Sequence, residues 1–225
     1  MTPAISIIMP TLNEADSIEQ TLVTVRALNL SAQVIVIDGG STDNTRELAG
    51  GLAHQVLRSE CGRARQMNAG AAAASGDYLL FLHADTELTV HAATQLQSAL
   101  EQQPTWGRFD VRISGDHRML AIIAFMMNWR SRITGIATGD QAIFVRREVF
   151  ESMGGYADQA LMEDIEISRQ LLKQSRPVCL KGPVITSGRR WQNHGVWPTI
   201  VLMWRLRWRY WRGASPEQLA RDYRR

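Results

Sequence analysis

The sequence contains only two cysteines, Cys61 and Cys179, and they show no short metal-binding spacing. This argues against a cysteine-based zinc site and against a structural disulfide, and unpaired thiols are typical of a reducing cytosol. Long hydrophobic runs are also missing, because the longest strongly apolar stretch, residues 119–127, is too short to span a bilayer. No cationic segment precedes the first apolar run at residues 5–9, so we expect no signal peptide.

Charge and aromatic residues are unevenly distributed along the 225 residues. Residues 189–225 hold nine arginines against two acidic residues, whereas residues 1–188 hold 16 basic and 20 acidic residues. The same 37-residue tail carries five of the seven tryptophans. With 45% apolar and 21% charged residues, the chain as a whole is typical of a folded globular protein. We therefore predict an enzyme-sized domain over residues 1–188 and a basic, tryptophan-rich helical appendage over residues 189–225.

Short apolar runs alternate with amphipathic patterns over the first hundred residues. Strands are predicted at residues 5–9, 34–37, 55–58 and 78–82. Helices are predicted around residues 18–28, at 41–48 with Ser41 as N-cap, at 62–75 and at 90–102. The alternation predicts a right-handed, mainly parallel α/β sheet flanked by helices. After Pro104 the pattern loosens, with strands expected at 109–113 and 142–145 and helices at 118–132 and 163–173.

Two of the predicted strands run directly into an aspartate. Residues 34–37 lead into Asp38 and a Gly-Gly-Ser turn, and residues 78–82 lead into His83-Ala84-Asp85. Ligands of open α/β sheets bind in the crevice outside the carboxyl ends of the strands. The spacing therefore predicts a polar, metal-assisted site, although either aspartate could instead cap a turn.

A third acidic motif, Glu163-Asp164, opens the helix predicted at residues 163–173. Acidic residues in a first helical turn are favoured by the helix dipole alone. The functional alternative is a general base at the helix N-terminus.

Together these motifs resemble the family 2 glycosyltransferases of GT-A fold. The resemblance spans roughly residues 5–175 and lies in the segments 6–14, 37–43, 83–85, 139–141 and 163–164, in the order and spacing of that family. Through residues 62–68 and 138–144 the chain most resembles bacterial members called radical-SAM/selenodomain-associated transferases.

The resemblance implies a role for each matching residue. The residues implied in nucleotide-sugar binding are Pro10, Asn13, Glu14, Asp38, Arg63, Asn68 and Ala84. Asp85, the last acid of a DxD motif, would hold Mg²⁺ or Mn²⁺, and His83 stands where the first acid is expected, as an alternative ligand or a spacer. Asp164 would be the catalytic base with Glu163 beside it. The residues implied on the acceptor side are Gly139, Asp140, Gln141, Arg190 and Trp191.

This resemblance implies a metal-dependent, inverting transfer of a sugar from a UDP- or GDP-type donor to a hydroxyl acceptor, with a lipid-linked acceptor as one option. Two alternatives from other classes remain at this point. One is a nucleotidyltransferase, for which residues 10–14 lack the expected basic glycine loop. The other is a non-catalytic nucleotide-sugar binder or scaffold, which would not need Asp164.

The tail contains an amphipathic helical pattern over residues 196–212. Its stripe consists of Trp197, Val201, Trp204, Trp208 and Trp211, with arginines on both flanks. A helix of this kind suits an anionic membrane surface and predicts a cytoplasmic protein held peripherally on the inner face of the membrane. Packing on the domain or on a second copy in a homodimer is the alternative. Nucleic acid binding is disfavoured because the rest of the chain is net acidic.

Overall fold

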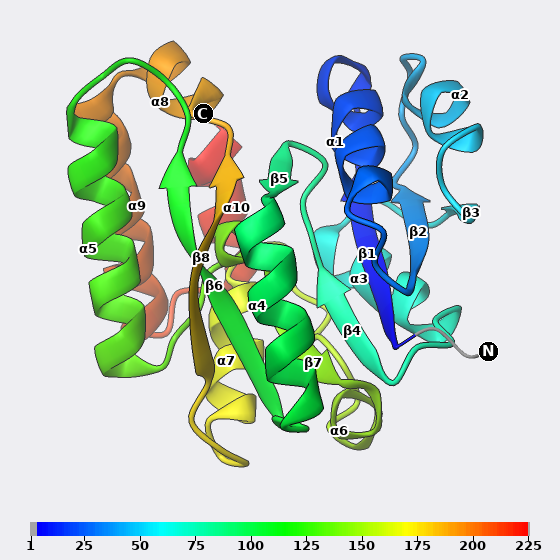
Figure 1. The fold of residues 1–225 in the computed structure, drawn as a ribbon. Coiled ribbons are helices and arrows are strands. Elements are labelled where there is room, and N and C mark those ends of the chain that lie inside the picture. The colour runs from blue at the N-terminus through cyan, green and yellow to red at the C-terminus, as the bar shows by residue number, and fades with distance from the viewer. Residues whose placement is uncertain (1–3, 225) are drawn as a thin grey trace.

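A computed structural model describes residues 4–224, so the outermost ends of the two predicted parts, residues 1–3 and 225, lie outside it. The described residues form one eight-stranded sheet in the order β3-β2-β1-β4-β7-β6-β8-β5 (Figure 1). The strands are β1 (Ile5–Thr11), β2 (Ala32–Asp38), β3 (Gln55–Arg58), β4 (Tyr78–Phe81), β5 (Thr86–Leu88), β6 (Trp106–Ile113), β7 (Phe144–Arg146) and β8 (Val178–Thr186).

The first half of the sheet is parallel, as predicted. Ile5 of β1 lies opposite Ala32 of β2 and, on its other side, opposite Tyr78 of β4. The connections between these strands carry α1 (Ala15–Ala27), α2 (Thr45–Gly50) and α3 (Arg63–Ala72). Because successive strand residues point to opposite faces, Ile7 joins the core cluster under α1 and α4 (Val90–Glu101), whereas Ile8 joins the cluster on the α3 side.

The second half of the sheet is mixed. β7 is antiparallel to both β4 and β6, β8 is parallel to β6, and β5 is antiparallel to β8. Strands β5 and β8 were not predicted, because β5 has three residues and Lys181-Gly182-Pro183 interrupts the apolar pattern of β8. The predicted α/β fold is thus present, with a larger antiparallel share than expected.

The remaining helices of the domain are α5 (Met119–Thr134), a 3₁₀ turn η1 (Gly139–Gln141), α6 (Arg147–Ser152) and α7 (Glu163–Leu171). Helix α2 begins at Thr45 rather than at the predicted Ser41. The reason is that residues 39–44 form a loop whose backbone N–H groups are bound by side chains instead of by a helix, as described below.

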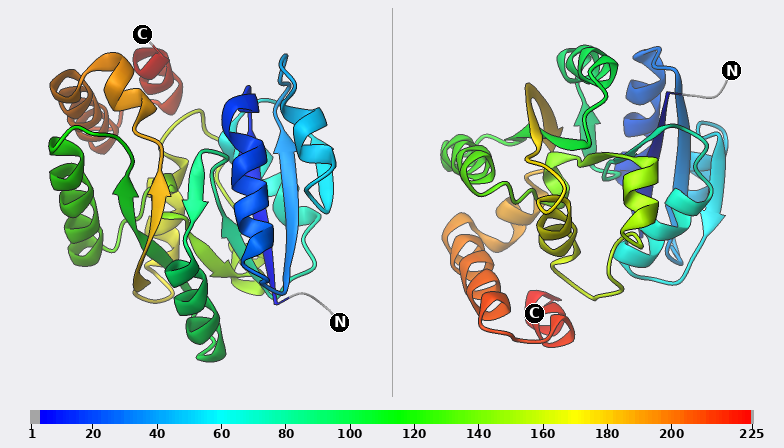
Figure 2. Two further views of the ribbon diagram at one scale, coloured as in Figure 1. Left: turned by 45° about the horizontal axis from the view of Figure 1, so that its top comes forward. Right: turned by 90° about the horizontal axis from the view of Figure 1, so that it is seen from below.

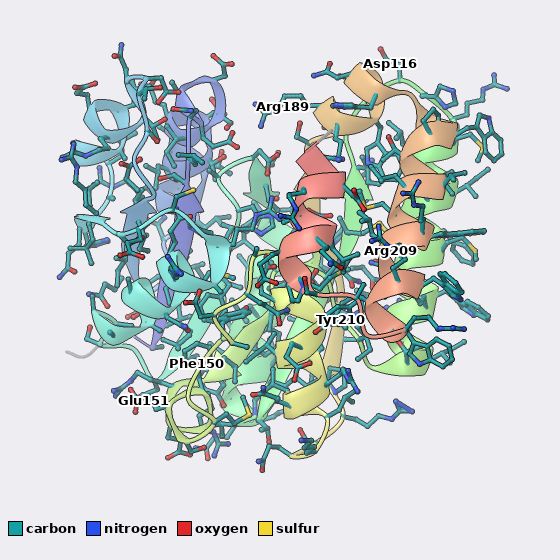
Figure 3. All side chains as sticks on the ribbon, turned by 180° about the vertical axis from the view of Figure 1, so that it is seen from behind. Asp116, Phe150, Glu151, Arg189, Arg209 and Tyr210 are labelled. Atoms are coloured by element: carbon teal, nitrogen blue, oxygen red, sulfur yellow. The ribbon has the colours of Figure 1, made fainter. Side chains whose placement is uncertain are left out.

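The tail folds into α8 (Arg189–His194), α9 (Val196–Trp211) and α10 (Pro216–Arg224). Helix α9 lies beside α5 at one end of the sheet, where Val196 packs with Leu120 and Ile123 (Figures 1 and 2). Arg209 pairs with Asp222 of α10, and Tyr210 Oη donates to Glu166 Oε2 of α7 at 3.4 Å (Figure 3). The tail therefore docks on the domain. No helix within residues 4–224 is long and apolar enough to cross a membrane.

Candidate active site

Two adjoining cavities open at the carboxyl ends of the central strands. The first, of about 550 Å³, lies outside the ends of β1 and β4 and includes Pro10, Glu14, Ala84 and Asp85 in its wall. The second, of about 500 Å³, lies between α5, α9 and the start of α7. The residues shared by both walls are Arg63, His83, Met127, Asp140, Leu161, Glu163, Trp191, Met203 and Tyr223. The crevice thus lies outside the strand ends as predicted, with Asp85 in its wall, but Asp38 lines neither cavity.

Asp85 lies in the first cavity within a group of acidic side chains. Burial raises the pKa of Asp85, and the charges of Glu14 and Asp140 add to this, while His83 and Arg189 oppose it. Arg189 Nη2 lies 2.9 Å from Glu14 Oε2 and 3.7 Å from Asp85 Oδ2. A partly buried carboxylate with acidic neighbours is a place where a cation is favourable.

The donor atoms at this position fit a hard divalent cation. Carboxylate oxygens are the ligands that Mg²⁺ and Mn²⁺ prefer, and such ions commonly complete their shell with substrate phosphates and water. Within residues 4–224 no group of three or more histidine, cysteine or acidic side chains is preassembled for a metal. Asp85 is therefore suited to hold a cation that a bound substrate helps to coordinate.

His83 is packed tightly between two residues of the η1 turn. Its Nδ1 lies 3.6 Å from Asp140 Oδ1, and a Cβ atom at Gly139 would come within 2.7 Å of its Nε2. Burial alone would raise the pKa of Asp140, but the hydrogen bond and charge of His83, with Arg63 and Arg207, lower it. These contacts favour a role for His83 in positioning Asp140 over a role as a metal ligand.

Asp38 and Asn13 hold the loop after β2 and are not part of either cavity wall. Asp38 is fully buried, and its carboxylate accepts the backbone N–H groups of Gly40 and Ser41 at 3.1 Å. Asn13 Oδ1 accepts the N–H of Thr42 at 2.9 Å. The turn needs glycine at position 40, where φ is +98°. The Gly40–Thr42 backbone that they hold is not in the wall of the first cavity either, so direct contact of Asp38 and Asn13 with a nucleotide stays a prediction.

Helix α3 contributes two residues that behave differently. Arg63 lines both cavities; burial acts to lower its pKa, but the charges of Glu163, Tyr223, Asp140 and Asp164 together outweigh this and the pKa is raised. Asn68, in contrast, holds the loop before α7 from the far side of α3. Its Nδ2 donates to the carbonyl of Tyr156 at 2.8 Å, and its Oδ1 accepts the Tyr156 N–H at 2.9 Å. The Asn68 amide is thus engaged with the Tyr156 backbone, and Asn68 is not part of either cavity wall.

Glu163 and Asp164 begin α7 at the floor of the second cavity. Asp164 Oδ2 accepts the backbone N–H of Gly139 at 3.1 Å, and its Oδ1 accepts the N–H of Ile165 at 2.8 Å. Glu163 is 6% exposed, and burial together with the charge of Asp164 raises its pKa, against the effect of Arg63. The two hydrogen bonds hold the Asp164 carboxylate in one orientation, and Asp164 lines the second cavity.

The η1 turn and the tail complete the acceptor-side set. Gly139 and Asp140 line the second cavity, whereas Gln141 is fully buried and accepts the Thr138 N–H at 3.2 Å within a capping box. Arg190 and Trp191 line the first cavity. Arg190 lies over the ring of Tyr223 at 3.7 Å and donates to the Tyr223 carbonyl at 3.0 Å.

Sequence reasoning missed three residues of this site. Arg189 points from α8 toward the acidic group (Figure 3), and Tyr223 lines both cavities from α10. Gln66 is 3% exposed and donates from Nε2 to the carbonyls of Thr11 and Ile37 at 2.7 and 2.8 Å, which joins the ends of β1 and β2. Of these three, Arg189 could have been suggested by the sequence, because it directly precedes the Arg190-Trp191 pair.

Comparison with known proteins gives one family match. A family described as Glycosyl transferase family 2 matches residues 6–154. An uncharacterized glycosyltransferase of Mycobacterium tuberculosis is 30% identical over 192 residues, which are 80% of this chain and 72% of that protein. Poly-beta-1,6-N-acetyl-D-glucosamine synthase of Staphylococcus aureus is 33% identical over 110 residues, 46% of this chain and 27% of that one.

Solved structures share the fold. A mannosyltransferase from Pyrobaculum calidifontis, in complex with GDP-Man and Mn²⁺, superposes with a TM-score of 0.63 at 23% identity over 99% of this chain and 69% of that one. S. aureus TarS 1–349, in complex with UDP-GlcNAc, gives 0.65 at 15% identity over 81% of this chain. The present chain spans 58% of the latter. These likenesses confirm the predicted GT-A type of α/β fold.

Proposed function

The chain belongs to glycosyl transferase family 2, and on this premise we propose that it moves a sugar from a nucleoside-diphosphate donor to a hydroxyl acceptor with inversion at the sugar carbon. The observation that supports this most is the placement of Asp85 and Asp164 in two cavities that share a wall. One carboxylate lies at a strand end beside other acids, and the other lies at a helix start beside an open apolar space.

The donor belongs in the first cavity. Pro10, Glu14, Arg63 and Ala84 would contact the nucleotide, and Asn68 would support it by holding the segment before α7, whose Ala160 and Leu161 line this cavity. Asp38 and Asn13 would lie on the nucleotide side through the loop after β2 that they hold. Asp85 would hold Mg²⁺ or Mn²⁺, which would stabilise charge on the leaving diphosphate. Similar proteins have been solved with UDP-GlcNAc, or with GDP-Man and Mn²⁺, in support of this donor class.

Asp164 would accept the proton of the acceptor hydroxyl. As the hydroxyl oxygen bonds to the anomeric carbon, the bond from that carbon to the diphosphate oxygen breaks and its electron pair leaves with the nucleoside diphosphate. The hydrogen bonds from Gly139 and Ile165 fix the orientation of the Asp164 carboxylate for this step. Asp140, with Arg190 and Trp191, would border the acceptor.

Family membership gives no support to the two alternatives, a nucleotidyltransferase and a non-catalytic binder or scaffold. The assignment to the radical-SAM/selenodomain-associated subgroup, the bacterial origin, the cytoplasmic location, the homodimer and the division at residue 188 stay predictions.

We propose further that α9 contacts a membrane surface. Its apolar stripe is exposed, from 57% at Trp208 to 80% at Trp211. Helix α5 adds Ile122, Phe125, Met126, Trp129 and Ile133, each at least half exposed, so the two neighbouring helices form one apolar face along an edge of the molecule (Figure 3). The flanking arginines suit anionic lipid, which supports a bilayer over a second copy of a chain with equally basic flanks.

A thermal-shift screen tests the proposed donor class. UDP-, GDP- and dTDP-sugars are each added with and without Mn²⁺, because a ligand that binds only the folded state raises Tm by mass action. At about 100 times Kd the expected stabilisation is about 2.7 kcal/mol, or several degrees. A Tm unchanged by every sugar nucleotide in both conditions would contradict the proposal.

A further inference from the structure

The second cavity has an apolar wall and a mouth on the exposed face of α5 and α9. Met119, Ile123 and Met127 of α5 and Ile200 and Met203 of α9 line its sides. Ile122, Met126, Trp129 and Trp204 also line it and are themselves at least half exposed. The cavity therefore connects the outer apolar face with Asp164 at its floor, and a long apolar chain can enter from outside.

Two arginines are among the side chains that line this cavity between the two helices. Arg130 comes from α5 and Arg207 from α9, and both line the cavity. The Nε and Nη2 atoms of Arg130 are buried without a hydrogen-bond partner, and within residues 4–224 neither guanidinium forms an ion pair. Burial and the charge of Arg207 lower the pKa of Arg130 to about 10, in spite of the charge of Asp164.

Within residues 4–224 no acid of this cavity forms an ion pair with Arg130 or Arg207, although the charge of Arg207 helps to lower the pKa of Asp140 and that of Asp164 acts to raise the pKa of Arg130. Asp164 accepts two backbone N–H groups, and Asp140 lies beside His83. Glu163 is buried next to Arg63, whose charge affects its pKa. The unpartnered donors of Arg130, in a cavity that a second guanidinium also lines, are costly unless an anion binds there. A phosphate, with several acceptor oxygens, matches two arginine forks.

We propose that the second cavity is an acceptor subsite for a phosphate-bearing amphiphile. The phosphate lies between Arg130 and Arg207, and the hydrocarbon chain runs along the methionine and isoleucine side chains to the face of α5 and α9. The phosphate thereby places a neighbouring hydroxyl at Asp164. The inference rests on the proposed function, because it names the acceptor class of that same site.

The test uses tryptophan fluorescence of the full chain, since Trp129, Trp191 and Trp204 line the cavity. Three probes are titrated: decyl phosphate below its micellar concentration, decanol, and inorganic phosphate. We expect decyl phosphate to bind at least about tenfold more tightly than either of the others, because only it offers both charge-assisted hydrogen bonds and apolar surface. Decanol binding as well as decyl phosphate would overturn the phosphate site. Inorganic phosphate binding as well as decyl phosphate would overturn the amphiphile.

Variants locate the site. Arg130→Gln and Arg207→Gln should each lower the affinity for decyl phosphate by about tenfold or more and leave the affinity for decanol unchanged. The control Arg205→Gln lies on α9, is exposed and is outside the cavity wall, and it should bind as the wild type does. Equal losses in Arg205→Gln, or none in the two cavity variants, would overturn the proposal. If Arg130→Gln fails to fold, the affinities of Arg207→Gln and of the charge-retaining Arg130→Lys for decyl phosphate are compared with that of Arg205→Gln instead.

Calorimetry of UDP or GDP with Mn²⁺ on the same variants separates this inference from the proposed function. Unchanged nucleotide affinity in Arg130→Gln is expected, and a loss equal to that of decyl phosphate would assign the arginines to the donor instead. A wild type that binds decyl phosphate but no sugar nucleotide would refute the transferase and leave the subsite. A wild type that binds the sugar nucleotide but shows no preference for decyl phosphate would refute the subsite alone.

Discussion

The carboxylate of Asp164 accepts the backbone N–H of Gly139 at 3.1 Å. This contact joins the start of α7 to the η1 turn, two segments that reach the cavity from different parts of the chain. It leaves the side chain of Asp164 oriented by main-chain donors and not by a neutralising cation. An asparagine could keep one of the two main-chain contacts of Asp164 through its amide oxygen, so Asp164→Asn removes the charge while retaining one orienting hydrogen bond.

Gln66 should matter for stability more than its surface exposure suggests. Its amide nitrogen donates to two strand-end carbonyls, Thr11 and Ile37. Gln66→Ala removes both hydrogen bonds, while the Thr11 carbonyl still accepts the Gly39 N–H at 2.9 Å and the Ile37 carbonyl still accepts the Thr11 hydroxyl at 3.3 Å, so we expect a loss of about 1–3 kcal/mol in the free energy of unfolding. Urea denaturation measures this, with Gln20→Ala on the exposed face of α1 as the control, expected to change by less than about 0.5 kcal/mol. Equal effects of the two substitutions would contradict the account.

Glu163 should make stability depend on pH. Its pKa is raised above the ordinary 4.5 by burial and by Asp164, so the folded state binds this proton more tightly than the unfolded state does. The protonated form of Glu163 stabilises the folded state. Its contribution to the free energy of unfolding is complete below pH 4.5 and is lost as the pH rises through the higher pKa of the folded state.

Glu163→Gln keeps a neutral side chain at every pH. As the pH rises from 4.5 to the raised pKa of Glu163 in the folded state, the Tm of the wild type should fall relative to that of Glu163→Gln. Below pH 4.5 the difference in Tm between the two proteins should no longer change. Thermal melts across pH measure the difference, with exposed Glu87→Gln as control. A wild type that gains Tm relative to Glu163→Gln as pH rises would have the opposite sign and would refute this interpretation.

Arg189 should compete with a cation for the acidic group. It lies 2.9 Å from Glu14 and 3.7 Å from Asp85, so removing its charge frees both carboxylates. We expect Arg189→Gln to bind Mn²⁺ alone more tightly than the wild type, while its Tm without metal changes little, because an exposed pair contributes about 0–1 kcal/mol. Titration calorimetry with Mn²⁺ and no nucleotide is the measurement. Weaker Mn²⁺ binding would show that Arg189 does not compete.

The face of α5 and α9 should bind anionic vesicles. The wild type is expected to co-sediment with vesicles containing phosphatidylglycerol, and less so at high salt because the arginine contribution is screened. Replacing Trp204 and Trp208 by serine should reduce the pelleted fraction several-fold. Val90→Ser removes an apolar side chain that is 73% exposed on α4, away from this face, and should pellet as the wild type does. Absence of the wild type from pellets at every salt concentration would refute membrane contact.

Local patterns predicted the parallel half of the sheet because the strands there are short, mainly apolar runs that alternate with helical patterns. They missed β8, whose Lys181 and Pro183 break that pattern, since its pairing with β6 and β5 depends on distant parts of the chain. The crevice was predictable because strand ends meet at one edge of a sheet. The sequence did not predict Arg189 and Tyr223 as site residues, because they reach the crevice only when the tail docks on the domain.

Motif-based roles were least informative where a polar side chain serves the backbone. Asn68 and Gln141 match family motifs, yet their amides bind Tyr156 and Thr138. A sequence shows that a polar residue is present and does not show which partner it satisfies. The apolar cavity between α5 and α9 depends likewise on the pairing of two helices about 70 residues apart, which neither helical pattern predicts alone.

Asp85 and Asp164 are proposed to have separate roles, Asp85 in holding the cation and Asp164 in accepting the proton of the acceptor hydroxyl. One paired measurement tests this most directly. Sugar-nucleotide binding with Mn²⁺, by calorimetry, and sugar transfer are followed in Asp85→Asn, Asp164→Asn and the control Asp158→Asn, which lies outside both cavities. We predict that Asp85→Asn loses Mn²⁺-dependent binding, whereas Asp164→Asn binds normally but transfers at least about 100-fold more slowly. Full Mn²⁺-dependent affinity in Asp85→Asn, or normal transfer by Asp164→Asn, would contradict the account.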